Sequence, residues 1–178
     1  MHRPRIRKLA ALLACLSLTP APTNAAELIS GRCHMGFCSW FSVEEKDLAG
    51  TAKAGALFKV VLKGWQSHHP DGNYARKTPR QGGQARTSYV FCSKSKPALI
   101  NRDEQGRSAA EYLSINAAFG PPGVLETATT IYFAVCHAIG AGSREDITDL
   151  ARRFGYPEQE GEGPAETPIA RPEDILRP

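Results

Sequence analysis

The residues of this 178-residue chain with the most evident chemistry are its five cysteines and five histidines. One cysteine, Cys15, lies in an N-terminal segment that has the pattern of an export signal. That segment begins with four basic side chains, continues with an apolar run from Leu9 to Leu18, and ends in Thr23-Asn24-Ala25. The sequence therefore predicts a signal peptide over residues 1–25 and a periplasmic or secreted protein.

The four cysteines after this segment are Cys33, Cys38, Cys92 and Cys136. We expect them to form disulfides, because these bonds persist in oxidising compartments. Of the three possible pairings, we favour Cys33–Cys38, which closes a tight loop, and Cys92–Cys136, which ties two distant segments together. In the chain-entropy account the short loop contributes about 2 kcal/mol to stability and the long loop about 4 kcal/mol.

A different processing route is an alternative. Leu12-Leu13-Ala14-Cys15 is similar to a bacterial lipobox, in which the cysteine is lipidated and becomes the N-terminus. The protein would then be a lipoprotein anchored through Cys15, with Leu16 to Ser30 as a tether. On either route the apolar run is too short to cross a bilayer as a helix, so we expect no transmembrane segment.

Metal and cofactor chemistry find little support. Cys33-His34 with Cys38, and Cys136-His137, offer soft ligands, but the repeated C-x₂₋₄-C spacing of zinc sites is absent. The chain also lacks the C-x-x-C-H haem motif, the G-x-S-x-G nucleophile turn and a phosphate-binding glycine loop followed by Lys-Ser/Thr. We therefore assign no metal ligands, no cofactor and no catalytic residues.

One short motif leads to an alternative function. Gly36-Phe37-Cys38-Ser39-Trp40-Phe41 resembles the nucleophile segment of CHAP-type amidases. The resemblance implies a cell-wall hydrolase with Cys38 as nucleophile and a histidine on a later strand as base; the downstream histidines are His68, His69 and His137. That function requires a free Cys38 thiol, because a sulfur held in a disulfide cannot attack as a thiolate.

The charge is unevenly distributed. Residues 1–25 hold four of the 22 Lys and Arg side chains and none of the 18 acidic ones, so the remaining chain is formally neutral. Residues 50–107 carry eleven Lys and Arg against three Asp and Glu, whereas residues 144–178 carry five against nine. An exported, net-neutral chain without a known module is not expected to bind nucleic acid.

The basic excess is densest in residues 66–86, a turn-rich segment that we expect to be a long loop. Its candidate binding residues are His68, His69, Tyr74, Arg76, Lys77, Arg80 and Arg86. A basic loop held between two strands suits an anionic partner, such as the phosphates of an envelope lipid or an acidic protein surface. The simpler interpretation is a solvated loop without a specific partner.

The patterns of the remaining segments predict an α+β fold: a small antiparallel sheet with one or two packed helices, stapled by two disulfides. We expect strands at 38–43, 57–65, 87–93 and 98–101, a turn or short helix at 43–50, and helices at 108–119 and 143–154. For 127–137 we favour a strand, with a buried helix as the alternative that the period leaves open. Residues 26–155 form a single domain and residues 156–178 a flexible, Pro- and Glu-rich tail. The sequence favours a non-enzymatic binding or accessory protein of the bacterial envelope.

Overall fold

Seven strands form one antiparallel sheet in which every strand lies beside its neighbours in sequence. The computed structural model describes residues 27–102, 105–140, 146–158 and 166–177. The strands are β1 (Ile29–His34), β2 (Phe37–Ala52), β3 (Gly55–His68), β4 (Arg80–Cys92), β5 (Ala98–Arg102), β6 (Ser108–Tyr112) and β7 (Glu166–Ile169). The helices are α1 (Glu126–His137) and α2 (Ile147–Arg153), with short 3₁₀ turns η1 (Gly123–Leu125) and η2 (Pro172–Leu176). The predicted antiparallel sheet with packed helices is confirmed, although the sheet is larger than expected.

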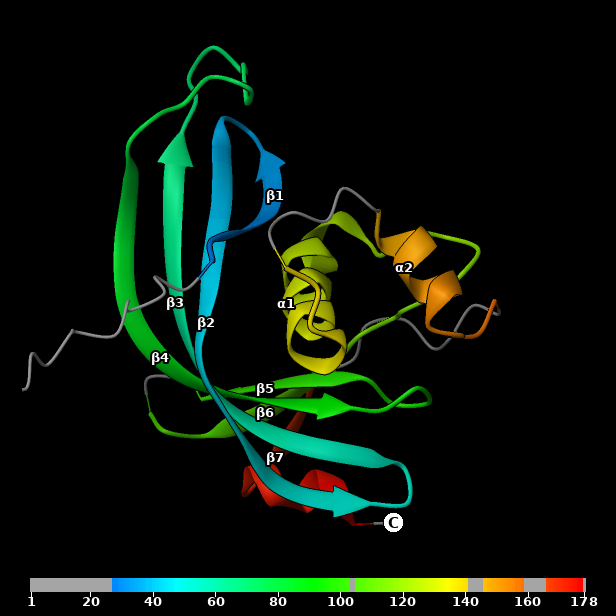
Figure 1. Cartoon of the computed structure of the whole chain (residues 1–178). Helices are drawn as coiled ribbons and strands as arrows, with labels where there is room; N and C mark the ends of the chain where they lie inside the picture. The colour runs from blue at the N-terminus through cyan, green and yellow to red at the C-terminus, as the bar shows by residue number, and fades with distance from the viewer. Residues whose placement is uncertain (1–26, 103–104, 141–145, 159–165, 178) are drawn as a thin grey trace, which may run out of the picture.

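The three longest strands, β2, β3 and β4, build a curved ribbon around α1 (Figure 1). The expected turn or short helix at 43–50 is wrong, because β2 continues through it to Ala52. Two irregularities in the β2–β3 register, at Val43/Glu45 and Leu48/Gly50, accompany this polar stretch. Such bulges bend a strand and increase its twist, which fits the curvature that wraps the sheet around the helix.

Two segments exchange their expected structures. Residues 108–119 were expected to be helical, but Ser108–Tyr112 is strand β6, paired with β5 and β7. The alanines there pack well in either state, and the sheet buries Ala110 completely. Residues 127–137 were expected to be a strand, but form most of α1. Three of the four buried side chains of that helix, Thr129, Tyr132 and Phe133, lie at helical spacing, and the fourth is Val135.

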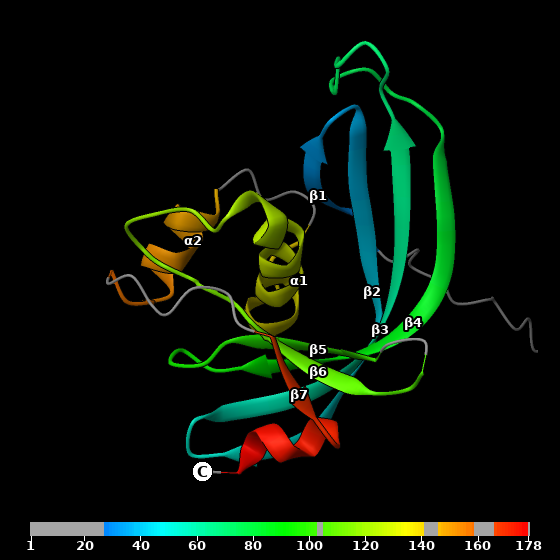
Figure 2. The same cartoon turned by 180° about the vertical axis from the view of Figure 1, so that it is seen from behind.

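Hydrophobic clusters lie on both sides of the sheet. The larger one joins the sheet residues Val60, Val90 and Leu99 to Tyr132 and Phe133 of α1. Opposite it, a second cluster comprises Leu57, Phe91, Ala98, Ile100 and Ala110, with Ile169, Ile175 and Leu176 packed against it. The predicted tail therefore needs correction for residues 166–177, because these supply β7 and η2, which cover this second cluster (Figure 2).

Both predicted disulfides are present. Cys33 and Cys38 face each other across β1 and β2, with their Cα atoms 4.0 Å apart. The second bond joins Cys92, at the end of β4, to Cys136, in the last turn of α1. The helix expected at 143–154 appears as α2, which begins after the N-cap residue Asp146. In the described part of the chain, no helix has the length and apolar character needed to cross a membrane.

Candidate binding site at the tip of the sheet

Two turns that are distant in sequence meet at one end of the sheet (Figure 1). They are the β1–β2 turn, residues 34–37, and the β3–β4 loop, residues 69–79. Together with the flanking residues His68 and Arg80, these two segments are called the tip. The amide of His69 donates to the carbonyl of Gly36 at 2.6 Å. The amide of Gly36 donates to the hydroxyl of Tyr74 at 3.1 Å. These bonds satisfy both backbone polar groups of Gly36 and join the turn to the loop.

His69 is 2% exposed, and its ring organises the inside of the loop. Nδ1 lies 3.1 Å from the carbonyl of Asn73, and Nε2 lies 2.9 Å from the hydroxyl of Ser67 and 3.2 Å from that of Thr78. A carbonyl only accepts, so Nδ1 carries the proton and Nε2 accepts from the two hydroxyls. His69 therefore holds the loop in shape and is not part of the exposed surface.

The tip is anchored on the sheet through Trp40. The indole Nε1–H of Trp40 donates to the hydroxyl of Ser67 at 2.9 Å, which extends the network that begins at His69. The guanidinium of Arg80 lies over the Trp40 ring, 4.0 Å from its centroid. This cation–π contact fixes the direction of an exposed arginine without neutralising it.

The charge of the tip is positive. Its single acidic residue, Asp71, accepts from the amide of Asn73 at 3.1 Å and pairs with Arg76 at 3.5 Å. The pKa of Asp71 is lowered, first by the backbone hydrogen bond from Asn73 and further by Arg76. Arg76 is therefore partly compensated, whereas Lys77 and Arg80 are exposed. His68 is exposed as well and stacks on Phe37, with ring centroids 4.7 Å apart.

Three large apolar or aromatic side chains of the tip are exposed to solvent. Met35 is 80% exposed, Phe37 48% and Tyr74 38%. Met35 and Phe37 are absent from the residues predicted from sequence, which were chosen by charge. The signal that identifies them is the short loop between Cys33 and Cys38, because a disulfide between facing strands leaves Met35-Gly36 as a two-residue turn at its apex.

Arg86 lies apart from the rest of the predicted set. It belongs to β4, opposite Leu62 of β3, and lines a groove of about 450 Å³ between the sheet and α1. Gln66 and Gln84 also line this groove, as do Thr127 and Ile131 of α1. The structure therefore brings together the other six predicted residues, of which His69 is internal, and places Arg86 on a different surface.

The proposed nucleophile of the hydrolase alternative, Cys38, is disulfide-bonded to Cys33 and 1% exposed. No thiolate is available in this state, and the sulfur has no access to a large substrate. His137 lies in the last turn of α1, where it bonds to Tyr156 and stacks on Phe154. Within the tip, His69 uses both ring nitrogens inside the loop, and His68 stacks on Phe37.

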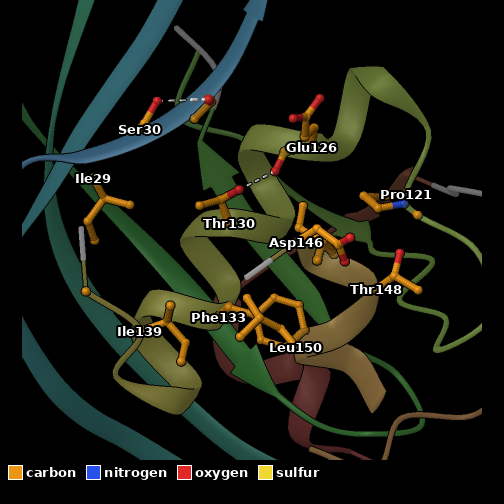
Figure 3. Close-up of a pocket in the computed structure, with 14 residues that line it drawn as sticks. Ile29, Ser30, Pro121, Glu126, Thr130, Phe133, Ile139, Asp146, Thr148 and Leu150 are labelled. Carbon is orange, nitrogen blue, oxygen red and sulfur yellow. Dashed lines mark hydrogen bonds between the residues drawn. The ribbon is translucent and has the colours of Figure 1, made fainter. Parts of the chain in front are cut away.

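A further pocket of about 420 Å³ lies between β1, α1 and α2 (Figure 3). Three of its polar side chains, Glu126, Asp146 and Thr130, are engaged locally. Glu126 pairs with Arg32 at 3.6 Å, Asp146 caps α2 by accepting from the amide of Asp149, and Thr130 donates to the carbonyl of Glu126. The carboxylates of Glu126 and Asp146 therefore have structural roles, and we assign no catalytic or binding function to this pocket.

A buried hydrogen-bond chain connects α1 with the segment after α2. The hydroxyl of Tyr156 donates to that of Tyr132 at 2.8 Å, and Tyr132 both accepts from the amide of Ser93 and donates to its carbonyl. Nε2 of His137 lies 2.9 Å from the Tyr156 hydroxyl, whose proton is already used, so Nε2 donates. Burial, with the nearby cations Lys94, Arg153 and Lys46, lowers the pKa of His137. Burial raises the pKa values of both tyrosines.

No cluster of three or more metal-ligating side chains occurs among the residues that the structure describes. No protein-family model matches the chain, and neither a curated protein nor a solved structure shows significant similarity to it.

Proposed function

We propose that this chain is an exported, non-enzymatic binding protein of the bacterial envelope that contacts an anionic partner through the tip. The observation that carries the proposal is an internally braced loop with exposed Lys77 and Arg80, neither of which pairs with a carboxylate among the residues that the structure describes. A braced loop loses little conformational entropy on binding, which favours affinity.

The charge balance supports a local rather than a global attraction. Without residues 1–25 the chain is formally neutral, so retention by a polyanion depends on a concentrated patch of positive charge. At the tip the single carboxylate, Asp71, is already occupied by Arg76. Disulfides and the export pattern favour the periplasm or the exterior as the place where this binding occurs.

The test is the salt concentration that elutes the protein from immobilised heparin, used as a generic polyanion. The double variant Lys77→Gln/Arg80→Gln should elute at clearly lower salt than the parent protein, because each phosphate- or sulfate-contacting cation adds to the salt dependence. The matched control is Lys53→Gln/Arg86→Gln, which removes the same charge from exposed positions outside the tip. Equal elution of the two double variants would refute the proposal.

The hydrolase alternative has a separate readout. Thiol alkylation followed by intact mass measurement should find Cys38 blocked before reduction. A free Cys38 with peptidoglycan-degrading activity would replace the binding proposal.

A further inference from the structure

The exposed side chains at the apex, Met35 and Phe37, are apolar, and a purely charged partner does not require apolar contacts. The β1–β2 turn has Met35 at its first position, with φ 49°, followed by Gly36 with φ 79°. Two-residue hairpin turns with two positive φ values strongly favour Asn, Asp or Gly at the first position. A methionine held there is in a strained backbone conformation, and it is 80% exposed.

We propose that the anionic partner is a lipid bilayer and that the apex of the tip, Met35 and Phe37, enters its interfacial region while Lys77 and Arg80 contact anionic headgroups. This inference rests on the proposed function and specifies its partner. Apolar side chains that enter the boundary between headgroups and acyl chains, together with cations at headgroup level, are the general requirements of peripheral membrane binding.

The backbone of Gly36, between the two apex side chains, is prepared for leaving water. An amide or carbonyl transferred to an apolar medium without a partner is strongly unfavourable. At Gly36 both groups are already engaged, the amide with the Tyr74 hydroxyl at 3.1 Å and the carbonyl with the His69 amide at 2.6 Å. The apex can therefore be immersed to a shallow depth without losing hydrogen bonds to water from these groups.

The distribution of charge is complementary to an anionic membrane. Residues 28–43 contain no acidic side chain, and residues 66–86 contain only Asp71. His34 and His68 are exposed beside the apex and carry no negative charge. No carboxylate in these two segments, other than the paired Asp71, would be repelled by lipid phosphates.

The experiment is flotation of the exported protein with vesicles of phosphatidylglycerol and phosphatidylcholine, and with phosphatidylcholine alone. Its N-terminus is first established by intact mass, so that all variants are compared in the same processed form. We expect binding to the anionic vesicles, weaker binding to the neutral ones, and a loss of about tenfold in affinity for Met35→Asn, because one buried methionine supplies roughly that factor.

Three variants separate insertion from misfolding. Asn suits the left-handed backbone at this position, so Met35→Asn should keep or raise the melting temperature. Met35→Leu keeps an apolar side chain and should retain vesicle binding. Val124→Asn changes an equally exposed apolar side chain outside the tip, 79% exposed, and should leave binding unchanged.

The outcomes distinguish this inference from the function on which it rests. Heparin retention that depends on Lys77 and Arg80, without vesicle binding, would overturn the bilayer assignment and leave the anionic-partner proposal in place. Vesicle binding unaffected by Met35→Asn would also overturn it, as would self-association through the apex that Met35→Asn abolishes. If the parent protein neither is retained by heparin nor binds vesicles, both proposals are refuted.

Discussion

Removing one hydroxyl from the buried chain of tyrosines should destabilise the protein far more at Tyr132 than at Tyr156. The Tyr132 hydroxyl makes three hydrogen bonds: it accepts from the Ser93 amide at 3.1 Å, donates to the Ser93 carbonyl at 2.9 Å, and accepts from Tyr156 at 2.8 Å. Tyr132 is 1% exposed and Ser93 3%, so water does not reach the groups that the change would leave behind.

The expected magnitudes follow from those partners. Tyr132→Phe leaves the amide and the carbonyl of Ser93 without the hydroxyl in a buried site, and each unsatisfied group costs about 1–3 kcal/mol. The free energy of unfolding should therefore fall by about 2–6 kcal/mol. Tyr156→Phe removes one donor to Tyr132, which keeps both bonds to Ser93, and one acceptor for the partly exposed His137; the expected loss is about 1 kcal/mol.

Urea unfolding at pH 7 measures both losses, with the dependence on denaturant concentration checked for constancy so that only stability has changed. Tyr89→Phe is the matched control, because Tyr89 lies on β4 and is only partly buried. Its effect should lie within about 0.5 kcal/mol of zero. A Tyr132→Phe loss equal to or smaller than that of Tyr156→Phe would refute the reasoning from buried backbone partners.

Three further changes test other parts of the structure. Replacing Cys92 and Cys136 by alanine should lower the free energy of unfolding by about 4 kcal/mol, roughly twice the effect of removing the Cys33–Cys38 disulfide. Thermal or urea unfolding measures both losses, and a loss no larger than that for Cys33–Cys38 would contradict the expected ranking. Glu111 faces Glu166 across β6 and β7, and its pKa is raised by burial and then by Glu166, so it destabilises the fold as pH rises through that pKa. Glu166→Lys should add up to about 1 kcal/mol to the free energy of unfolding at pH 7, a gain that should shrink as pH falls and Glu111, whose pKa lies above its ordinary value, becomes protonated. The pKa of His137 is lowered, so its contribution to stability is complete above about pH 6.5 and is lost as pH falls through the lower pKa of the folded state. His137→Gln should therefore flatten the decline of melting temperature between pH 7 and 5. An unchanged decline would assign that decline to other groups.

The local patterns located most strands but exchanged the structures of two segments and missed the continuation of β2 through 43–50, and the reasons are physical. Ser108–Tyr112 contains good helix formers, and propensity is a weak preference that tertiary context overrides. Here β5 and β7 flank the segment on both sides and bury Ala110. The opposite error at 127–137 came from β-branched residues in α1, because the period of a short apolar run does not distinguish a buried strand from a buried helix.

The long strands were underestimated for a different reason. Residues 44–47 are charged and mostly exposed in the structure, so no apolar period marks them as part of β2. Their pairing with β3 continues because the two strands form a hairpin that closes between Ala52 and Gly55. Strand length here depends on the partner strand, which a window of local sequence does not contain.

The candidate site likewise combines features that the local sequence predicts with one that it does not. Charge density alone located the β3–β4 loop, and the predicted Cys33–Cys38 bond alone implied an apex at Met35. What joins them is the register of β2 with β3, in which Phe37 faces His68 and Cys38 faces Ser67.

That register also gives two adjacent histidines opposite roles. His68 remains exposed against Phe37, while His69 turns inward to Ser67 and braces the loop. Because successive strand residues alternate between faces, a shift of one residue would exchange these environments. The chemistry of the tip is therefore set by the long-range pairing of β2 with β3. The sequence predicts each of the two segments separately, but it does not predict that they meet.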